Sequence, residues 1–154
     1  MPRNLSRLDS LLLHLVKKFM ERTGREITIT RLVKLLYLSD LEFRRRGMPG
    51  LGVRWVRWYY GPFSNEIVRE VEFLVERGYL KEEYVPTSSG VIRVFRTKRG
   101  LSFEVDPNVA AVLDEVIEKF GFMKFDKLLE EVYSTFDPEG VDLGEEISVE
   151  SPGR

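Results

Sequence analysis

One segment, apolar almost all the way round a helix, constrains the fold most. The chain between Thr30 and Arg46 has helical periodicity and ends at Gly47. One side carries Leu32, Leu36, Ser39 and Phe43, and the other positions carry Val33, Leu35, Tyr37, Leu38 and Leu41. A surface helix has a single apolar stripe, whereas a helix that is apolar on several sides must be covered on each of them. We therefore expect this helix at the centre of a helical domain, capped by Thr28 or Thr30.

Apolar residues at three-to-four spacing predict further helices on both sides of it. We expect helices over 5–23, from the cap Ser64 to Gly78, from the cap Asp106 to Gly121, and over 124–136. Ser and Asp accept hydrogen bonds from free backbone N–H groups at a helix start, and glycine suits the left-handed residue after its end.

Two β-prone runs, 79–85 and 91–97, flank Thr87-Ser88-Ser89-Gly90, which predicts a hairpin with Pro86 at a sheet edge. Val53 to Tyr60 reads as a short extended segment that Gly61-Pro62 should break. The fold class expected is mainly α with a small β-hairpin (α+β). A helix followed by a hairpin is the order of a winged helix, so we predict a winged-helix-like core of about five helices with a wing.

The composition fits one folded domain. The chain has 154 residues, 43% of them hydrophobic and 32% charged, and it has no Cys. Disulfides, thiol catalysis and cysteine zinc sites are thus excluded. No apolar run approaches the roughly 18 residues of a membrane span, so we expect a cytoplasmic protein without membrane contact. Scarce Asn and absent Gln fit a thermophilic source or a GC-rich genome. We expect residues 1–138 to form the domain and residues 139–154 to form an acidic, flexible tail.

Charge is distributed unevenly along the chain. Residues 1–60 carry 13 Lys and Arg against 5 Asp and Glu, and residues 101–154 carry 4 against 14. Such a gradient marks either a basic binding surface or two halves that attract each other in the fold. The second interpretation is favoured.

Enzymatic chemistry finds no support in the sequence. His14 is the only histidine, on the polar side of its helix, so we expect a solvated surface residue without a metal or catalytic role. The adjacent carboxylates of Glu82-Glu83, Glu130-Glu131 and Glu145-Glu146 point apart and share no proton. Gly50-Leu51-Gly52 precedes no helix and is a loop. No cofactor is expected.

Nucleic-acid binding is the main alternative. The helix before the wing usually enters the major groove, but here it carries four Glu against two Arg, which phosphates would repel. The basic candidates lie elsewhere, at Arg44, Arg45, Arg46, Arg93, Arg96, Lys98 and Arg99.

An aromatic and basic segment is the candidate surface for a partner. It consists of Arg54, Trp55, Arg57, Trp58 and Tyr59. Arginine interleaved with tryptophan suits base stacking and protein binding alike. The plainer interpretation places both tryptophans in the core or in an interface with the arginines facing outward, and it is favoured.

Two motifs resemble the Panacea domain, the SocA-like antitoxin family. The first is Leu32-Val33-Lys34-Leu35-Leu36-Tyr37-Leu38-Ser39-Asp40, and the second is Tyr60-Gly61-Pro62-Phe63-Ser64. The order of later elements also agrees, so the likeness extends over about residues 5–138. The short loop 48–53 and the acidic tail depart from the family pattern.

The resemblance implies a binding module that neutralises a partner toxin or presents it to a protease, not an enzyme. The resemblance implies a toxin encoded nearby as the partner, and since such domains combine with many unrelated toxins, the domain specifies neither which toxin it is nor the oligomeric state. The motif residues Lys34, Tyr37, Asp40, Tyr60, Gly61, Pro62 and Ser64 serve either packing or partner contact, with packing favoured. A winged-helix DNA-binding regulator is the alternative function.

Overall fold

The computed structural model describes residues 4–149, and in this range the protein is α+β, with five α-helices and two small antiparallel sheets. The helices are α1 (Arg7–Thr23), α2 (Ile29–Arg45), α3 (Asn65–Glu76), α4 (Pro107–Val116) and α5 (Phe125–Tyr133). The strands are β1 (Ile27–Thr28), β2 (Val56–Trp58), β3 (Gly61–Phe63), β4 (Leu80–Thr87) and β5 (Gly90–Thr97). Short π and 3-10 turns occupy Ile117–Gly121 and Pro138–Gly140.

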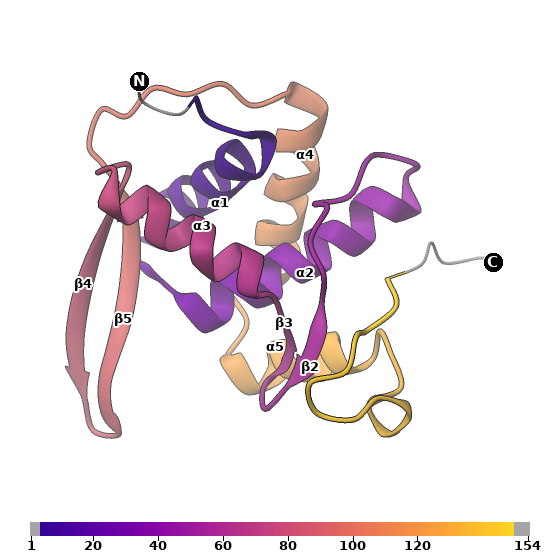
Figure 1. Ribbon diagram of the computed structural model, residues 1–154. Helices are drawn as coiled ribbons and strands as arrows, with labels where there is room; N and C mark the ends of the chain where they lie inside the picture. Colours follow the sequence, from indigo (N-terminus) through magenta and orange to yellow (C-terminus); the bar gives the residue numbers. More distant parts are fainter. Residues whose placement is uncertain (1–3, 150–154) are drawn as a thin grey trace.

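The apolar helix is central, as its sequence predicts. Residues 32–40 of α2 are all buried. α2 packs against α1, α4, α5 and β3, whereas α3 packs on α1 and β4 (Figure 1). A helix covered on this many sides buries polar side chains along with its leucines, and Lys34, Ser39 and Asp40 are buried with them.

The predicted helix caps are confirmed. Thr28, rather than Thr30, caps α2 by accepting from the backbone N–H of Arg31. Ser64 caps α3 and Asp106 caps α4, each accepting from backbone N–H groups of the first turn. Gly24 follows α1 with a φ of 73°, in the left-handed region. These local bonds fix where the helices start and stop, and packing then decides how they meet.

The predicted hairpin is also confirmed. β4 and β5 pair antiparallel from Leu80↔Thr97 to Thr87↔Gly90, and β1 adds to β5, which gives the order β1-β5-β4. Pro86 lies in the edge strand β4, where its missing N–H costs no ladder bond. Figure 1 shows this hairpin projecting away from the helices.

The second sheet corrects the sequence interpretation. Gly61-Pro62 does not end the extended segment but starts the returning strand, because β2 and β3 form a tight hairpin with Tyr59 and Tyr60 at the turn. No residue other than glycine has a positive φ in the described chain, and Gly61, with a φ of 91°, supplies the left-handed residue beside the turn.

Packing continues past the domain end expected at residue 138. The segment around Glu146 runs beside β2: Arg57 N–H donates to Glu145 O at 2.9 Å, and Ile147 N–H donates to Trp55 O at 2.8 Å. Ile147 is buried in the main core. Residues 150–154 of the expected tail lie outside the described part of the chain.

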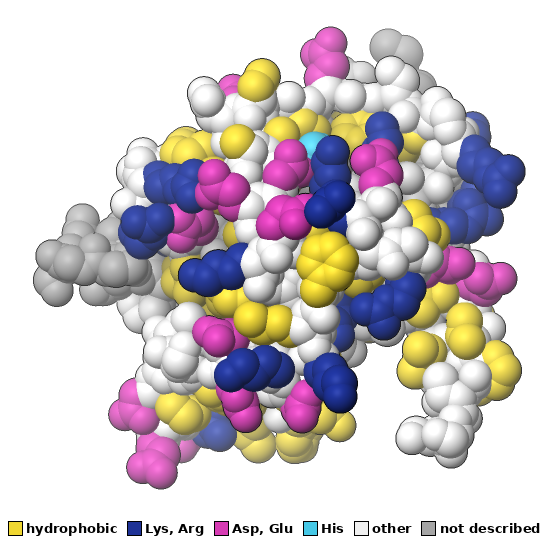
Figure 2. Space-filling view, turned by 180° about the vertical axis from the view of Figure 1, so that it is seen from behind, with side chains coloured by type: hydrophobic (Ala, Val, Ile, Leu, Met, Phe, Trp, Pro, Cys, Tyr) yellow, Lys and Arg dark blue, Asp and Glu magenta, His cyan; other side chains and the backbone are white. Residues whose placement is uncertain are grey.

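The basic and acidic parts of the chain form ion pairs with each other in the fold. Arg22 of α1 pairs with Glu118, Arg46 of α2 with Glu115, and Arg54 with Glu146. Basic N-terminal and acidic C-terminal segments therefore attract each other, as the favoured interpretation holds. Figure 2 shows Lys and Arg interspersed with Asp and Glu on one face of the molecule.

Candidate functional site

Asp40 organises the loop after α2. Its carboxylate is fully buried and accepts three hydrogen bonds: from Leu51 N–H at 2.9 Å, from Trp55 Nε1–H at 2.8 Å and from Arg44 Nε at 3.3 Å. The bond to Arg44 joins an acid and a base one helical turn apart on α2. A buried charge with this many donors is well compensated, so Asp40 pins the loop and Trp55 to the central helix.

Gly50 makes this network possible. A Cβ at Gly50 would lie 2.6 Å from Asp40 Oδ1 and 2.9 Å from Arg44 Nε, which is closer than such atoms approach. The loop 48–53 therefore passes directly over the carboxylate. The sequence marked the Gly50-Leu51-Gly52 loop but gave no signal that it covers a buried charge.

Tyr37 extends the same network toward the C-terminal helix. Its ring meets Trp55 edge-on, with centroids 5.2 Å apart, and its hydroxyl lies 2.8 Å from Thr135 Oγ1. Since the Thr135 hydroxyl donates to Val132 O, Tyr37 is the donor of this pair. Burial raises the pKa of the Tyr37 phenol. Tyr37 thus ties α2 to the residues just after α5.

The two tryptophans of the expected partner surface separate. Trp55 is 1% exposed and belongs to the core, so it is not part of an exposed patch. Trp58 is 44% exposed on β2. An odd separation along extended backbone puts two side chains on opposite faces, and here one face meets α2 and the other solvent. Arg57 is only partly exposed and donates to Val141 O, which holds the C-terminal segment to β2.

The β2–β3 turn presents an exposed aromatic cluster, formed by Trp58, Tyr59 and Tyr60. Tyr59 and Tyr60 are 67% and 60% exposed, and Trp58 meets Tyr59 edge-on at 5.0 Å. Below the turn, Gly61 and Pro62 are buried. A Cβ added to Gly61 would lie 3.6 Å from Val132 Cγ1 and 3.7 Å from Lys34 Cε, so this glycine packs against both side chains. The aromatic turn is therefore exposed at its tip and anchored at its base.

Lys34 lies beneath this turn and is 2% exposed. Its Nζ donates to Pro62 O at 2.9 Å, the one hydrogen bond of this ammonium within the described chain. No carboxylate of residues 4–149 forms an ion pair with it. Burial lowers the pKa of Lys34 to about 8. A buried, lightly compensated cation of this kind is a recognised mark of functional sites.

The remaining motif residue, Ser64, is fully buried and caps α3 through Ile67 N–H. The motif residues are thus brought together around α2 and β3, some in the core and some at its surface. Tyr60 is the exposed member, while Pro62 provides the carbonyl that meets Lys34.

The basic residues of the nucleic-acid alternative are mostly paired with acids. Arg45 and Arg46 bind Glu42, and Arg46 also binds Glu115. On the β4–β5 hairpin, Arg93 contacts Glu72 at 2.7 Å and Glu82 at 3.1 Å. These hydrogen bonds raise the pKa of the Arg93 guanidinium, and the bond from Arg93 lowers the pKa of Glu82. Arg96 faces Glu26, whereas Lys98 and Arg99 are exposed at the strand end. Four of these seven basic residues, Arg44, Arg45, Arg46 and Arg93, therefore form ion pairs within the fold.

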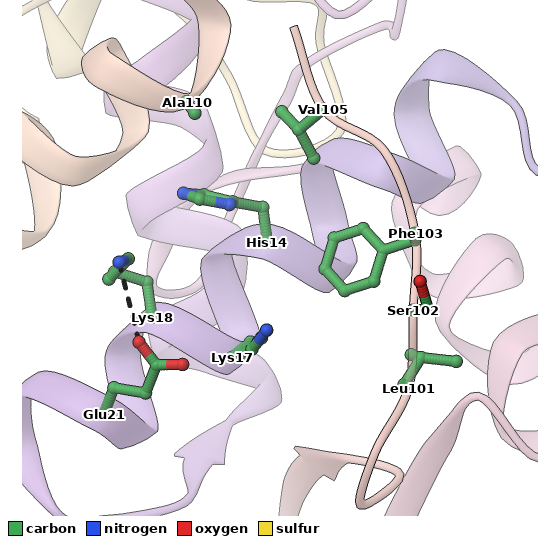
Figure 3. Close-up of a pocket in the computed structure, with 9 residues that line it drawn as sticks. All are labelled: His14, Lys17, Lys18, Glu21, Leu101, Ser102, Phe103, Val105 and Ala110. Carbon is green, nitrogen blue, oxygen red and sulfur yellow. Dashed lines mark ion pairs between the residues drawn. The ribbon is translucent and has the colours of Figure 1, made fainter. Parts of the chain in front are cut away.

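A hollow of about 370 Å³ between α1 and the segment 101–105 is a further candidate (Figure 3). Its charged groups are engaged: Lys18 pairs with Glu21 at 3.5 Å, and Lys17 lies over the Phe103 ring. His14, expected to be solvated, is partly buried with Nε2 2.7 Å from Asp114 Oδ1, because α4 covers that side of α1. The hollow therefore contains no uncompensated group comparable to Lys34.

The described chain offers neither a metal site nor a membrane-spanning helix. Residues 4–149 contain no cluster of three or more His, Asp or Glu side chains arranged to hold a metal ion. No helix in this range is both long enough and apolar enough to pass through a bilayer.

Comparisons with known proteins give one match. No curated protein and no solved structure matches the chain. The family model described as antitoxin SocA-like, Panacea domain, matches residues 32–135, which include both motifs, the aromatic turn and the buried charges of α2. This match covers most of the sequence, so the chain belongs to the SocA-like antitoxin, Panacea domain family.

Proposed function

We propose that this protein is an antitoxin-like binding module. Its aromatic turn binds a partner protein, which is a toxin encoded beside it. The role is binding and not catalysis. The observation that carries the proposal is the exposure of Trp58, Tyr59 and Tyr60 on one short, anchored hairpin.

Physical reasons support this surface. Aromatic side chains supply large contact areas at low entropic cost, and Trp and Tyr are the residue types that dominate binding hot spots. The turn is held at its base by the Lys34–Pro62 bond and on its far side by the segment that pairs with β2. A pre-ordered hairpin loses little freedom on binding, which favours affinity.

The experiment is co-expression of the chain with the product of the adjacent gene. We expect the two proteins to co-purify and the chain to relieve the growth defect that the neighbour causes. The double variant Trp58→Ala/Tyr60→Ala should weaken the complex by about 2 kcal/mol or more, as loss of hot-spot residues does. Tyr84→Ala is the matched control, because Tyr84 is an equally exposed aromatic residue on the distant β4.

Two outcomes would overturn the proposal. One is a neighbouring product that is neither toxic nor bound. The other is a complex that Tyr84→Ala weakens while the double variant leaves it intact, which would move the interface to the β4–β5 hairpin.

A DNA-binding regulator is the second candidate, and one observation favours it. β1 lies beside β5, and the order α1-β1-α2, then α3-β4-β5, is similar to that of a winged helix, although the β2–β3 hairpin is inserted between α2 and α3. Against it stand the acidic α3 and the arginine pairs described above. A mobility-shift assay on the chain's own promoter tests it: specific binding should fall steeply with salt and with Arg96→Ala and Lys98→Ala.

A further inference from the structure

The slot beside the aromatic turn has the composition of a specific side-chain pocket. Its walls are Ile29 and Val33 of α2 together with Trp58, Tyr60 and Phe63 of the hairpin, and Lys34 contributes to the same lining. The volume is about 130 Å³. Cofactor and drug sites usually measure about 300–1,000 Å³, so this slot suits one side chain rather than a small-molecule ligand.

Lys34 sets the chemistry of the slot. An ammonium carries three N–H donors, and here one of them meets Pro62 O while no described carboxylate approaches. A buried charge is costly unless it is paired with an opposite charge or fully hydrogen-bonded. The slot is therefore complementary to an acceptor that carries negative charge.

The walls refine the choice of occupant. They are apolar along most of their length. Besides Lys34, the polar groups of the lining residues are the hydroxyls of Thr30 and Tyr60 and the indole N–H of Trp58. An occupant that matches both features has an apolar stem and an anionic end. Glutamate, with two methylene groups before its carboxylate, fits this description better than an aliphatic or a neutral amide side chain.

Resting on the proposed function, we infer that the slot formed by α2 and the β2–β3 hairpin receives a glutamate side chain of the partner protein, whose carboxylate pairs with Lys34. The aromatic turn then provides the contact area, and the slot provides the selectivity.

The test uses the isolated chain and a defined probe, so that it does not depend on finding the partner. N-acetyl-glutamate N-methylamide is titrated into ¹⁵N-labelled protein, and the indole N–H signal of Trp58 is followed. The indole of Trp55, which is bonded to Asp40 in the core, is the internal reference. The matched probe is N-acetyl-glutamine N-methylamide, which has the same shape without the charge.

We expect saturable shifts of the Trp58 signal at millimolar glutamate probe, with the glutamine probe weaker by about tenfold or more, the equivalent of a charge-assisted hydrogen bond. Lys34→Met should abolish the difference between the two probes. Tyr60→Ala is a surface change that removes one wall of the slot, so it should weaken binding of the glutamate probe. This variant keeps the test decisive if Lys34→Met does not fold.

Equal response to the two probes would overturn the inference and indicate a purely apolar pocket. Absence of any Trp58 shift would overturn it as well. Neither result bears on whether the neighbouring protein co-purifies with this chain. In the same way, a positive result with the probe remains valid if the neighbouring protein does not bind.

Discussion

Lys34 and Asp40 lie less than two turns apart on α2, and both are buried, yet their surroundings differ. Asp40 receives three donors, among them a backbone N–H and an indole. Lys34 has one carbonyl as its partner and borders a solvent-open slot. The same helix thus carries one charge that is fully compensated within the fold and one that is not.

This difference in compensation assigns Asp40 to the architecture of the fold and Lys34 to the proposed binding surface. Removing a compensated buried charge lowers the stability of the protein mainly because its hydrogen-bond partners are left buried and unsatisfied. A buried charge with few partners lowers the stability of the free protein. Binding of a ligand with the opposite charge offsets that cost. The Asp40 end of α2 holds the loop, Tyr37 and Trp55, and the Lys34 end supports the aromatic turn.

The largest expected effect is at Asp40. Asp40→Asn should lower the free energy of unfolding by about 3–5 kcal/mol, since it leaves buried donors and Arg44 without their carboxylate. Urea unfolding at neutral pH measures this. Glu42→Gln, a partly exposed carboxylate on the same helix, is the control and should cost about 1 kcal/mol or less. Equal losses would erase the distinction between the two ends of the helix.

Removing the charge of Lys34 should raise the free energy of unfolding, the opposite of the effect at Asp40, and the effect should depend on pH. The pKa of Lys34 is about 8 in the folded protein against 10.5 for a free lysine. Between these pH values the unfolded chain binds more protons, so the stability of the native protein rises with pH across this window, by about 3 kcal/mol at most. Below pH 8 the buried charge is present at full cost.

Lys34→Met isolates this contribution from that of Tyr37, which titrates at higher pH. We expect the variant to be at least as stable as the native protein at pH 7, and its advantage to shrink as the pH rises from about 8 to 10.5. Unfolding of both proteins in urea at several pH values measures the difference. A constant difference would mean that Lys34 is already compensated.

Tyr37→Phe should have an intermediate effect. It removes the hydrogen bond to Thr135 and keeps the ring against Trp55, so we expect a loss of about 1 kcal/mol in the free energy of unfolding. Tyr59→Phe is the control, because that hydroxyl is on an exposed side chain and its removal should leave thermal unfolding unchanged. A loss of several kcal/mol would show that the Asp40 network reaches further than its direct bonds.

The smallest effect on stability should come from the turn itself. Tyr59→Ala should change the free energy of unfolding by no more than about 0.5 kcal/mol, as exposed substitutions do. The same variant should reduce co-purification with the neighbouring protein. A destabilised variant would indicate that the turn belongs to the core and is not a free binding surface.

Much of the fold was predictable because its signals are local. The caps at Thr28, Ser64 and Asp106 depend on neighbouring residues, and so does the hairpin around Thr87–Gly90. The course of the chain at Gly61-Pro62 was misjudged, since a breaker signal cannot distinguish an end from a tight reversal. Composition also placed the end of the domain at residue 138, although Ile147 is buried against β2.

The sequence alone determined the central helix, the caps at Ser64 and Asp106, the β4–β5 hairpin and the family motifs, because each depends on residue spacing within a few turns or strands. Tertiary structure decided which tryptophan is buried, which buried charge is compensated, and where a slot opens. Those outcomes depend on partners such as Leu51 for Asp40 and Pro62 for Lys34, which lie 11 and 28 residues away along the chain. No local pattern encodes such distances, so the candidate site became visible only when the folded chain brought these groups together.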